Sequence, residues 1–161
     1  MIYRGCHALE TDTNDCYRCN TQICAKLSTY NWTEDLADLP SNIVEIRFKN
    51  TRKGFYVNVN ELDLCSGDIV AVEASPGHDI GIVSLTGTLA LRQYAHSKAK
   101  ATNEELKKVY RKARSVDIEK WQAAIAREHE TMLKARKISE QLQLEMKIGD
   151  VEFQGDGTQA I

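Results

Sequence analysis

The chain has 161 residues, of which 42% are hydrophobic and 27% are charged, and this composition is typical of a folded protein. Its formal net charge of −2 excludes a global attraction to nucleic acid or membranes, so any such attraction must be local. No apolar run reaches the ~20 residues that a membrane helix needs, and the first residues lack the apolar core of a signal peptide. We therefore expect a protein of the reducing cytoplasm, where structural disulfides are rare.

The N-terminal segment is polar and irregular and carries four of the five cysteines. Cys16 and Cys19 have the C-x-x-C spacing at which two thiolates reach one metal ion, and Cys24 is near enough to be a third ligand. Cys6 or His7 would complete a zinc site, and the same donors suit an iron–sulfur cluster. Unligated thiols and a redox pair are the alternatives, since there is no second C-x-x-C and no thioredoxin-like context.

The next segment predicts several short strands. "IVEIRF" alternates between apolar and polar residues, "GFYVNV" is rich in aromatic and β-branched residues, and "SGDIVAVEA" and "PGHDIGIVSLTG" join turn signals to apolar runs. Four or five strands with glycines at the corners favour a small barrel of SH3-like or OB-like size. In such a barrel Phe48 continues the inward series of Val44 and Ile46.

The segment after residue 101 predicts two helices. The first begins at the capping-box sequence "TNEE" and has apolar or small residues at helical spacing: Leu106, Val109, Tyr110 and Ala113. The second is capped by Ser115 and carries one apolar stripe, which consists of Ile118, Trp121, Ile125, Met132, Ala135, Ile138 and Leu142.

The stretch "MKIGDVEFQGDGTQAI" predicts a strand, a turn at residues 155–157 and the start of a return strand. Because two strands alone are marginal in water, we expect a fragment that ends inside a truncated domain. The predicted fold class is therefore α+β. Its parts are a cysteine-containing segment (1–42), a small β-barrel-like domain (43–93), and a helical arm with the first strands of a truncated α+β domain (102–161).

A basic loop lies among the predicted strands. Arg47, Lys49, Arg52 and Lys53 stand beside aromatic residues, a pattern that holds single-stranded RNA on some small barrels, although a solvated loop has the same composition. The basic run of residues 107–114 is interpreted as a solvated helix face.

No pattern in the sequence brings together residues that are typical of an active site. His78 beside Asp79 is interpreted as part of a turn, and no nucleophile, phosphate loop or carboxylate pair has a recognisable context. We therefore expect neither an enzyme nor a small-molecule substrate.

Three stretches, "VEIRFKNTRKGFYVN", "GDIVAVEASPGHDIGIVSLTG" and "LEMKIGDVEFQGDGTQAI", resemble the bacterial regulators called RicT or YaaT, particularly their Bacteroidetes-type branch. The resemblance runs from about Lys26 to Ile161. It implies a β-rich region, a helical segment and a C-terminal region of the polymerase-suppressor type that continues beyond residue 161.

The resemblance also implies a regulatory function. Described family members form a complex with two small helical proteins, bind iron–sulfur clusters and act on messenger-RNA processing through the membrane-tethered endoribonuclease RNase Y. The cysteines before "KLSTYNW" are similar to those expected in this branch, which favours Cys16, Cys19 and Cys24 as ligands. The C-terminal cysteine motif of the family is absent from this chain, and its sporulation role is not expected to carry over.

Overall fold

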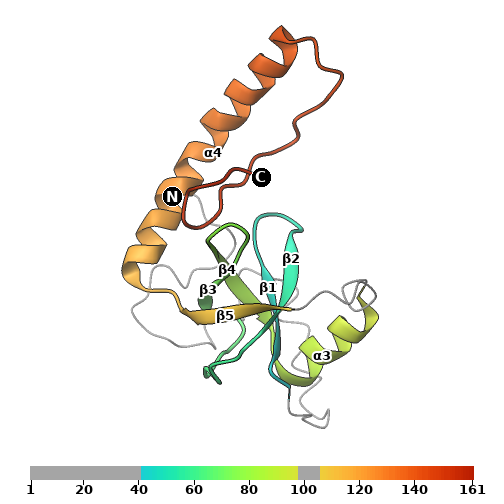
Figure 1. The fold of residues 1–161 in the computed structure, drawn as a ribbon, viewed down its shortest axis with the longest axis vertical. Coiled ribbons are helices and arrows are strands. Elements are labelled where there is room, and N and C mark those ends of the chain that lie inside the picture. Colours follow the sequence, from blue (N-terminus) through green and yellow to red (C-terminus); the bar gives the residue numbers. More distant parts are fainter. Residues whose placement is uncertain (1–40, 98–105) are drawn as a thin grey trace.

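Five short strands pair in a ring, with one helix lying beside it and a longer helix rising away from it (Figure 1). The computed structural model describes residues 41–97 and 106–161. The strands are β1 (Ile43–Arg47), β2 (Lys53–Val57), β3 (Ile69–Glu73), β4 (His78–Leu85) and β5 (Lys107–Lys112), and the helices are α3 (Gly87–His96) and α4 (Ser115–Gln141). The predicted α+β class and the barrel-like β region are confirmed.

The ring has the strand order β1-β2-β5-β3-β4 and closes through the pairing of β4 with β1. All pairs are antiparallel except β2 with β5, which run parallel and bring Tyr56 beside Lys107 and Val57 beside Lys108. β5 thus closes the gap between β2 and β3, although the chain reaches it only after β4 and α3.

Alternation along the strands fills the inside of the ring with apolar side chains. The buried cluster there consists of Val44, Ile46, Phe48, Tyr56, Val70, Val72, Val83 and Val109. Gly81 of β4 faces the same interior: a Cβ at this position would lie 2.5 Å from Ile46 Cγ2 and 2.8 Å from Phe48 Cε1. The predicted inward orientation of Phe48, which is 4% exposed, is confirmed.

The predicted helix over residues 106–113 is wrong, because residues 107–112 form β5. Of the residues at helical spacing, Val109 is fully buried, whereas Tyr110 is 43% exposed. Ring closure decides the conformation: β2 and β3 each offer an unpaired edge, and β5 satisfies both with backbone hydrogen bonds.

Helix α3 was not predicted, since Gly87 was interpreted as the end of a strand rather than the start of a helix. The helix packs against β1, and Ala90 in its first half is fully buried. At its other end Tyr94 makes an edge-on contact with Phe55 of β2, with ring centroids 5.4 Å apart.

Helix α4 covers the outer face of β3 and β4. Its Trp121 and Ile125 form a buried cluster with Ala71, Ile80 and Ile82. The predicted helix start is confirmed, but Ser115 is not the capping residue. Instead, the Asp117 carboxylate accepts the backbone N–H of Arg114 at the start of the helix. The predicted apolar stripe is buried only near the ring: Ile138 and Leu142 are 54% and 63% exposed.

After α4 the chain turns back alongside the helix and returns to the ring (Figure 1). The predicted strand over residues 146–153 is wrong, since the only bridge described there joins Phe153 to Ala160. The predicted turn at residues 155–157 is present: the carbonyl of Gln154 accepts the N–H of Gly157, the N–H of Gln154 donates to the carbonyl of Gln159, and Glu152 exchanges two backbone hydrogen bonds with Ile161. All residues from 151 to 155 are buried, between the ring on one side and α4 on the other.

Candidate functional site

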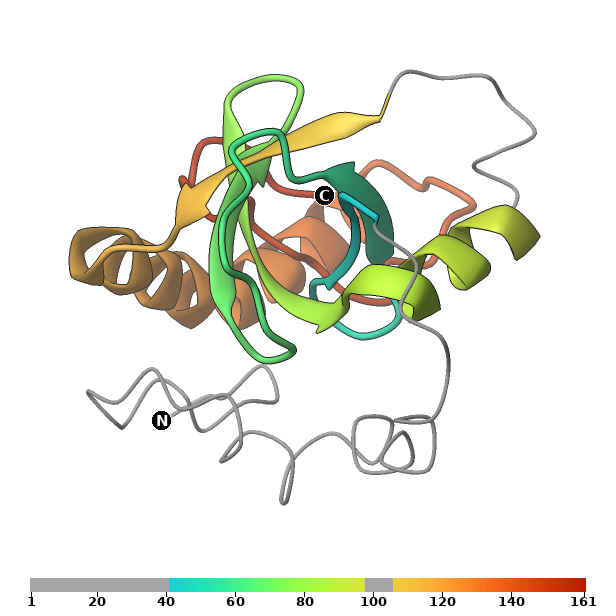
Figure 2. The ribbon, with the colours of Figure 1, turned by 90° about the horizontal axis from the view of Figure 1, so that it is seen from below.

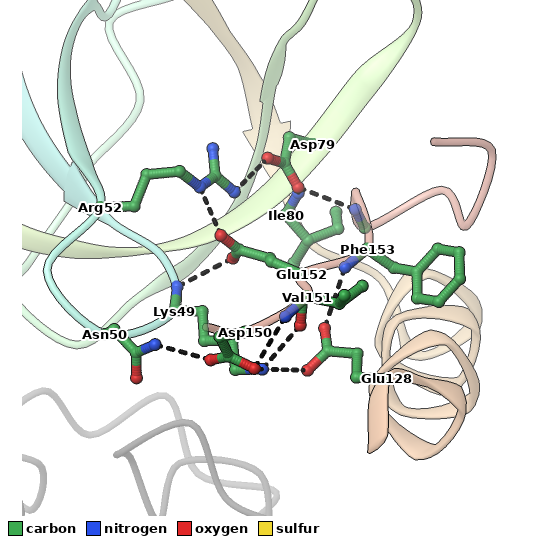
Figure 3. A network of polar contacts seen from close by, with 11 residues as sticks. Lys49, Asn50, Arg52, Asp79, Ile80, Glu128, Asp150, Val151, Glu152 and Phe153 are labelled. Atoms are coloured by element: carbon green, nitrogen blue, oxygen red, sulfur yellow. Dashed lines mark hydrogen bonds and ion pairs between the residues drawn. The ribbon is translucent and has the colours of Figure 1, made fainter. Parts of the chain in front are cut away.

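A network of charged side chains fastens residues 150–155 to both the ring and α4 (Figure 3). We call it the clamp. Its members come from the β1–β2 loop, β4, α4 and the C-terminal segment, and they are Lys49, Asn50, Arg52, Asp79, Glu128, Asp150 and Glu152.

Arg52 joins the C-terminal segment to β4. Its Nε donates to Glu152 Oε2 at 2.6 Å and its Nη2 donates to Asp79 Oδ2 at 2.7 Å, while the guanidinium lies 3.8 Å from the ring centroid of Phe48. Burial alone lowers the pKa of Arg52, but the hydrogen bonds to Glu152 and Asp79 outweigh it and raise that pKa. Both carboxylates are almost fully buried, so this cation is their main compensation.

Lys49 joins the same segment to α4. Its Nζ lies 2.6 Å from Asp150 Oδ1, 3.0 Å from Glu128 Oε2 and 2.7 Å from the carbonyl oxygen of Val151. The hydrogen bond from Lys49 lowers the pKa of Asp150 to about 2. The backbone N–H of Lys49 also donates to Glu152 Oε1 at 2.9 Å.

The clamp carboxylates also accept backbone N–H groups of the buried segment. Glu128 Oε1 accepts the N–H of Phe153 at 3.0 Å, and Asp79 Oδ1 accepts the N–H of Gly155 at 2.7 Å. The bridge of Phe153 to Ala160 uses backbone groups of residues 152, 154, 159 and 161 and not these two N–H groups, so the carboxylates take the place of a sheet ladder for them. The clamp therefore holds the segment in place, and its groups are already engaged in hydrogen bonds rather than open to a substrate.

The four basic residues predicted to contact nucleic acid are largely engaged inside the protein. Lys49 and Arg52 belong to the clamp, and Lys53 Nζ pairs at 2.7 Å with Glu45, which is 2% exposed and also accepts the hydroxyl of Ser84. Arg47 ends β1 and has interactions of its own. RNA contact through this loop stays a prediction, but these cations offer less free charge than the sequence indicates.

The predicted metal ligands Cys16, Cys19 and Cys24 lie outside the described residues. Within residues 41–97 and 106–161, no three His, Cys, Asp or Glu side chains are grouped as a metal site requires. Cys65, the cysteine that the structure does describe, is partly buried and free. The structure therefore supplies no geometry for a cluster, and its ligands remain those expected from the sequence.

Large apolar side chains are exposed where α4 extends beyond the ring and the chain turns back. They are Leu133, Ile138, Leu142, Leu144 and Met146, each 49–63% exposed. A groove between the helix and the returning chain is lined by Arg136, Ser139, Leu144 and Met146 among others, and Arg136 links its two sides by donating to the carbonyls of Ile148 and Gly149. We call this part of the molecule the arm tip.

Fold and site together define a small α+β protein in which a strand ring carries a helical arm, with the chain clamped back onto the ring. Residues 107–161, which supply β5, α4 and the clamped segment, match the family model described as the PSP1 C-terminal conserved region. No curated protein and no solved structure matches the chain. Among the described helices, none has the length and apolar character required to cross a membrane.

Proposed function

We propose that this chain is a non-enzymatic regulatory subunit of the cytoplasm that modulates messenger-RNA processing through protein contacts with an endoribonuclease. The observation that carries the proposal is the PSP1 match over residues 107–161, which agrees with the resemblance to the RicT or YaaT regulators. The match includes the whole arm and the clamp residues Glu128, Asp150 and Glu152.

The arm tip is the proposed docking surface for the small helical partner proteins. Five large apolar side chains lie within residues 133–146 on an element that stands away from the ring, and such exposed patches mark protein–protein contacts. An amphipathic helix would bury its apolar face against the groove beside Leu144 and Met146. The clamp supports this role because it fixes the returning chain to the ring and so keeps the groove in one shape.

An iron–sulfur cluster held by Cys16, Cys19 and Cys24 is the second part of the proposal, with zinc as the alternative. Thiolates at this spacing are the donors that such clusters use. The test is to purify the chain without oxygen and to quantify iron, zinc and acid-labile sulfide, in parallel with a Cys16→Ser/Cys19→Ser variant. Iron and sulfide that disappear in the variant are expected, whereas zinc alone would indicate a structural site and no metal would overturn this part.

The docking part has its own test, in which binding to the purified helical partners and to the endoribonuclease of the same organism is measured by calorimetry. Leu142→Glu/Met146→Glu is expected to weaken partner binding by at least tenfold, since it places charges in an apolar contact. The matched control Glu130→Gln/Lys134→Gln changes an exposed ion pair on the same helix and is expected to bind normally. Equal binding by both variants would overturn the docking surface.

A further inference from the structure

Within residues 41–97 and 106–161, the two helices cover the outside of the ring unevenly. Helix α3 packs over β1, so that Glu45 and Ser84 are nearly fully buried there, and α4 covers β3 and β4 through Trp121. Between these two covered sectors lie β2 and β5. β5 crosses the near side of the ring in Figure 1, and neither helix is drawn over it there; in the view from below in Figure 2 the end of β5 leads into α4, where Arg111 pairs with Asp117 of that helix.

Two lysines and a tyrosine are exposed along this uncovered sector. Lys107 and Lys108 are exposed, and no ion pair of their side chains is found among the described residues, in contrast to Lys49, Arg52 and Lys53. Lys108 lies beside Val57 of β2. Acidic groups next to β5 include Glu73, whose carboxylate accepts the N–H of Lys108, and two that pair with cations in its second half, Asp117 with Arg111 and Asp68 with Lys112.

Tyr110 follows the inward Val109 on β5 and lies at a break in strand pairing. Val72 of β3 pairs with Val109 and Ala71 pairs with Arg111, so Tyr110 is an extra residue without a partner on β3. The Tyr110 ring is 43% exposed, while its carbonyl oxygen is fixed by a hydrogen bond from Asn60 Nδ2 at 2.8 Å. A planar ring is thus presented to solvent from a firmly held backbone.

A second aromatic pair borders the sector. Phe55 lies on the outer side of β2, one residue before the inward Tyr56, and it is partly exposed beside Tyr94 of α3. Small barrels that bind single strands combine such features: cations follow the phosphates and aromatic rings stack on successive bases. We propose that the β2–β5 face, consisting of Phe55, Val57, Lys107, Lys108 and Tyr110, binds single-stranded nucleic acid.

The inference goes beyond the proposed function, because it requires neither the cluster nor the arm tip. It also differs from the basic loop of Arg47–Lys53, whose lysines and Arg52 are paired internally. In this face Lys107 and Lys108 hold phosphates, and Tyr110 supplies the stacking surface for a base. Since the described residues provide no ion-pair partner for these two cations, binding a phosphate breaks no ion pair that the structure shows.

The test is fluorescence anisotropy with labelled oligouridine, oligothymidine and a duplex, each of about 12 nucleotides, which is within the site sizes of barrel modules. Lys107→Gln/Lys108→Gln is expected to lower the magnitude of the logarithmic salt slope by about 1.4, as two lost phosphate contacts require. Tyr110→Ala is expected to weaken binding by at least about fivefold, whereas Tyr110→Phe, which keeps the ring, binds normally.

The matched control is Lys120→Gln/Lys137→Gln, which removes the same charge from exposed positions of α4 and is expected to leave binding unchanged. Thermal unfolding of each variant separates lost binding from lost folding. A preference for oligouridine or for oligothymidine identifies RNA or DNA as the ligand. Equal losses in the control pair, tighter binding to the duplex, or no binding to any oligonucleotide overturns the proposal, and the last outcome would assign the face to a protein partner.

Discussion

The carboxylate of Asp79 on β4 accepts the backbone N–H of Gly155 at 2.7 Å, across 76 residues of sequence. Its other oxygen accepts Arg52, so a single buried side chain connects the basic loop, the ring and the C-terminal segment. Gly155 lies so close to β4 that a Cβ would be 2.4 Å from Ile80 Cγ1 and 2.5 Å from its backbone nitrogen. The segment can take this position only because residue 155 has no side chain.

Gly155→Ala is accordingly expected to destabilise the protein by about 1–3 kcal/mol, as overpacking of a tight contact does. The measurement is chemical denaturation followed by circular dichroism. Gly149→Ala is the matched control, because no atom lies within 4 Å of a Cβ at residue 149, and it is expected to leave stability unchanged or slightly raised. Equal stability of the two variants would contradict the close approach to Ile80.

Removal of the central clamp cation tests the energetic role of the network. Arg52→Met leaves Asp79 and Glu152 buried without their cation. We expect a loss of ~2–3 kcal/mol in the free energy of unfolding. This is less than the ~3–5 kcal/mol expected when a fully buried ion pair is broken, because the Arg52 side chain is 32% exposed. Adding Asp79→Asn and Glu152→Gln removes the two stranded charges and is expected to restore part of the loss.

The control for this experiment is Lys134→Met, which breaks the exposed pair with Glu130 and is expected to change stability by less than about 0.5 kcal/mol. If Arg52→Met lowered the free energy of unfolding as little as this control does, Arg52 would not contribute measurably to stability through the clamp.

Acid is expected to weaken the junction between β5 and α4. The hydrogen bond from Arg111 lowers the pKa of Asp117 to about 2, from an ordinary value of 3.8. A carboxyl whose pKa is lower in the folded state contributes stability above its unfolded pKa and loses that contribution as the pH falls from about 4 towards 2. Asp150 of the clamp, with a pKa of about 2, adds to the loss over the same range.

The measurement for this prediction is the free energy of unfolding as a function of pH. Asp117→Asn is expected to be less stable than the unaltered chain at pH 7 and to lose less stability on acidification, whereas the exposed Glu119→Gln follows the unaltered chain. Parallel pH profiles for all three proteins would rule out the proposed role of Asp117.

Packing inside the ring predicts which of two glycine-to-alanine substitutions destabilises the protein more. A Cβ at residue 81 would meet Ile46 and Phe48 at 2.5 and 2.8 Å, whereas one at residue 54 would meet only the Tyr56 ring, at 3.1 Å. Gly81→Ala is therefore expected to lower the melting temperature more than Gly54→Ala, since a few tenths of an ångström suffice to relieve the second contact. Differential scanning calorimetry checks the order, and the reverse order would argue against the packing of Phe48.

The sequence predicts the parts of the fold in which local pattern and tertiary environment agree. Val44, Ile46 and Phe48 alternate because one face of β1 is buried inside the ring, and Trp121 and Ile125 are spaced for one helix face. Residues 107–112 mislead because their apolar positions fit a helix until two strand edges compete for their backbone. Residues 151–155 are buried on all sides, so no period of two or 3.6 marks them.

The clamp was beyond prediction for a different reason. Its contacts join Lys49 and Arg52 to residues about 100 positions away, and nothing local distinguishes Glu152 from a solvated carboxylate. The composition of the loop predicts an external phosphate as the partner of its cations, whereas the protein itself supplies anions for Lys49, Arg52 and Lys53. The exposed lysines of β5 belong to the basic run of residues 107–114, which the sequence predicts as a solvated helix face and the structure places on a strand.

The late position of β5 in the chain has a consequence for biosynthesis. While the ribosome has released only the first hundred residues, β1 to β4 exist without the strand that joins β2 to β3, and both of those edges stay open. Open edges recruit strands from other molecules, so the nascent protein is most prone to aggregate in this interval. Release of residue 112 from the ribosome ends the interval, because β5 can then pair with β2 and β3, and until that point folding competes with intermolecular pairing.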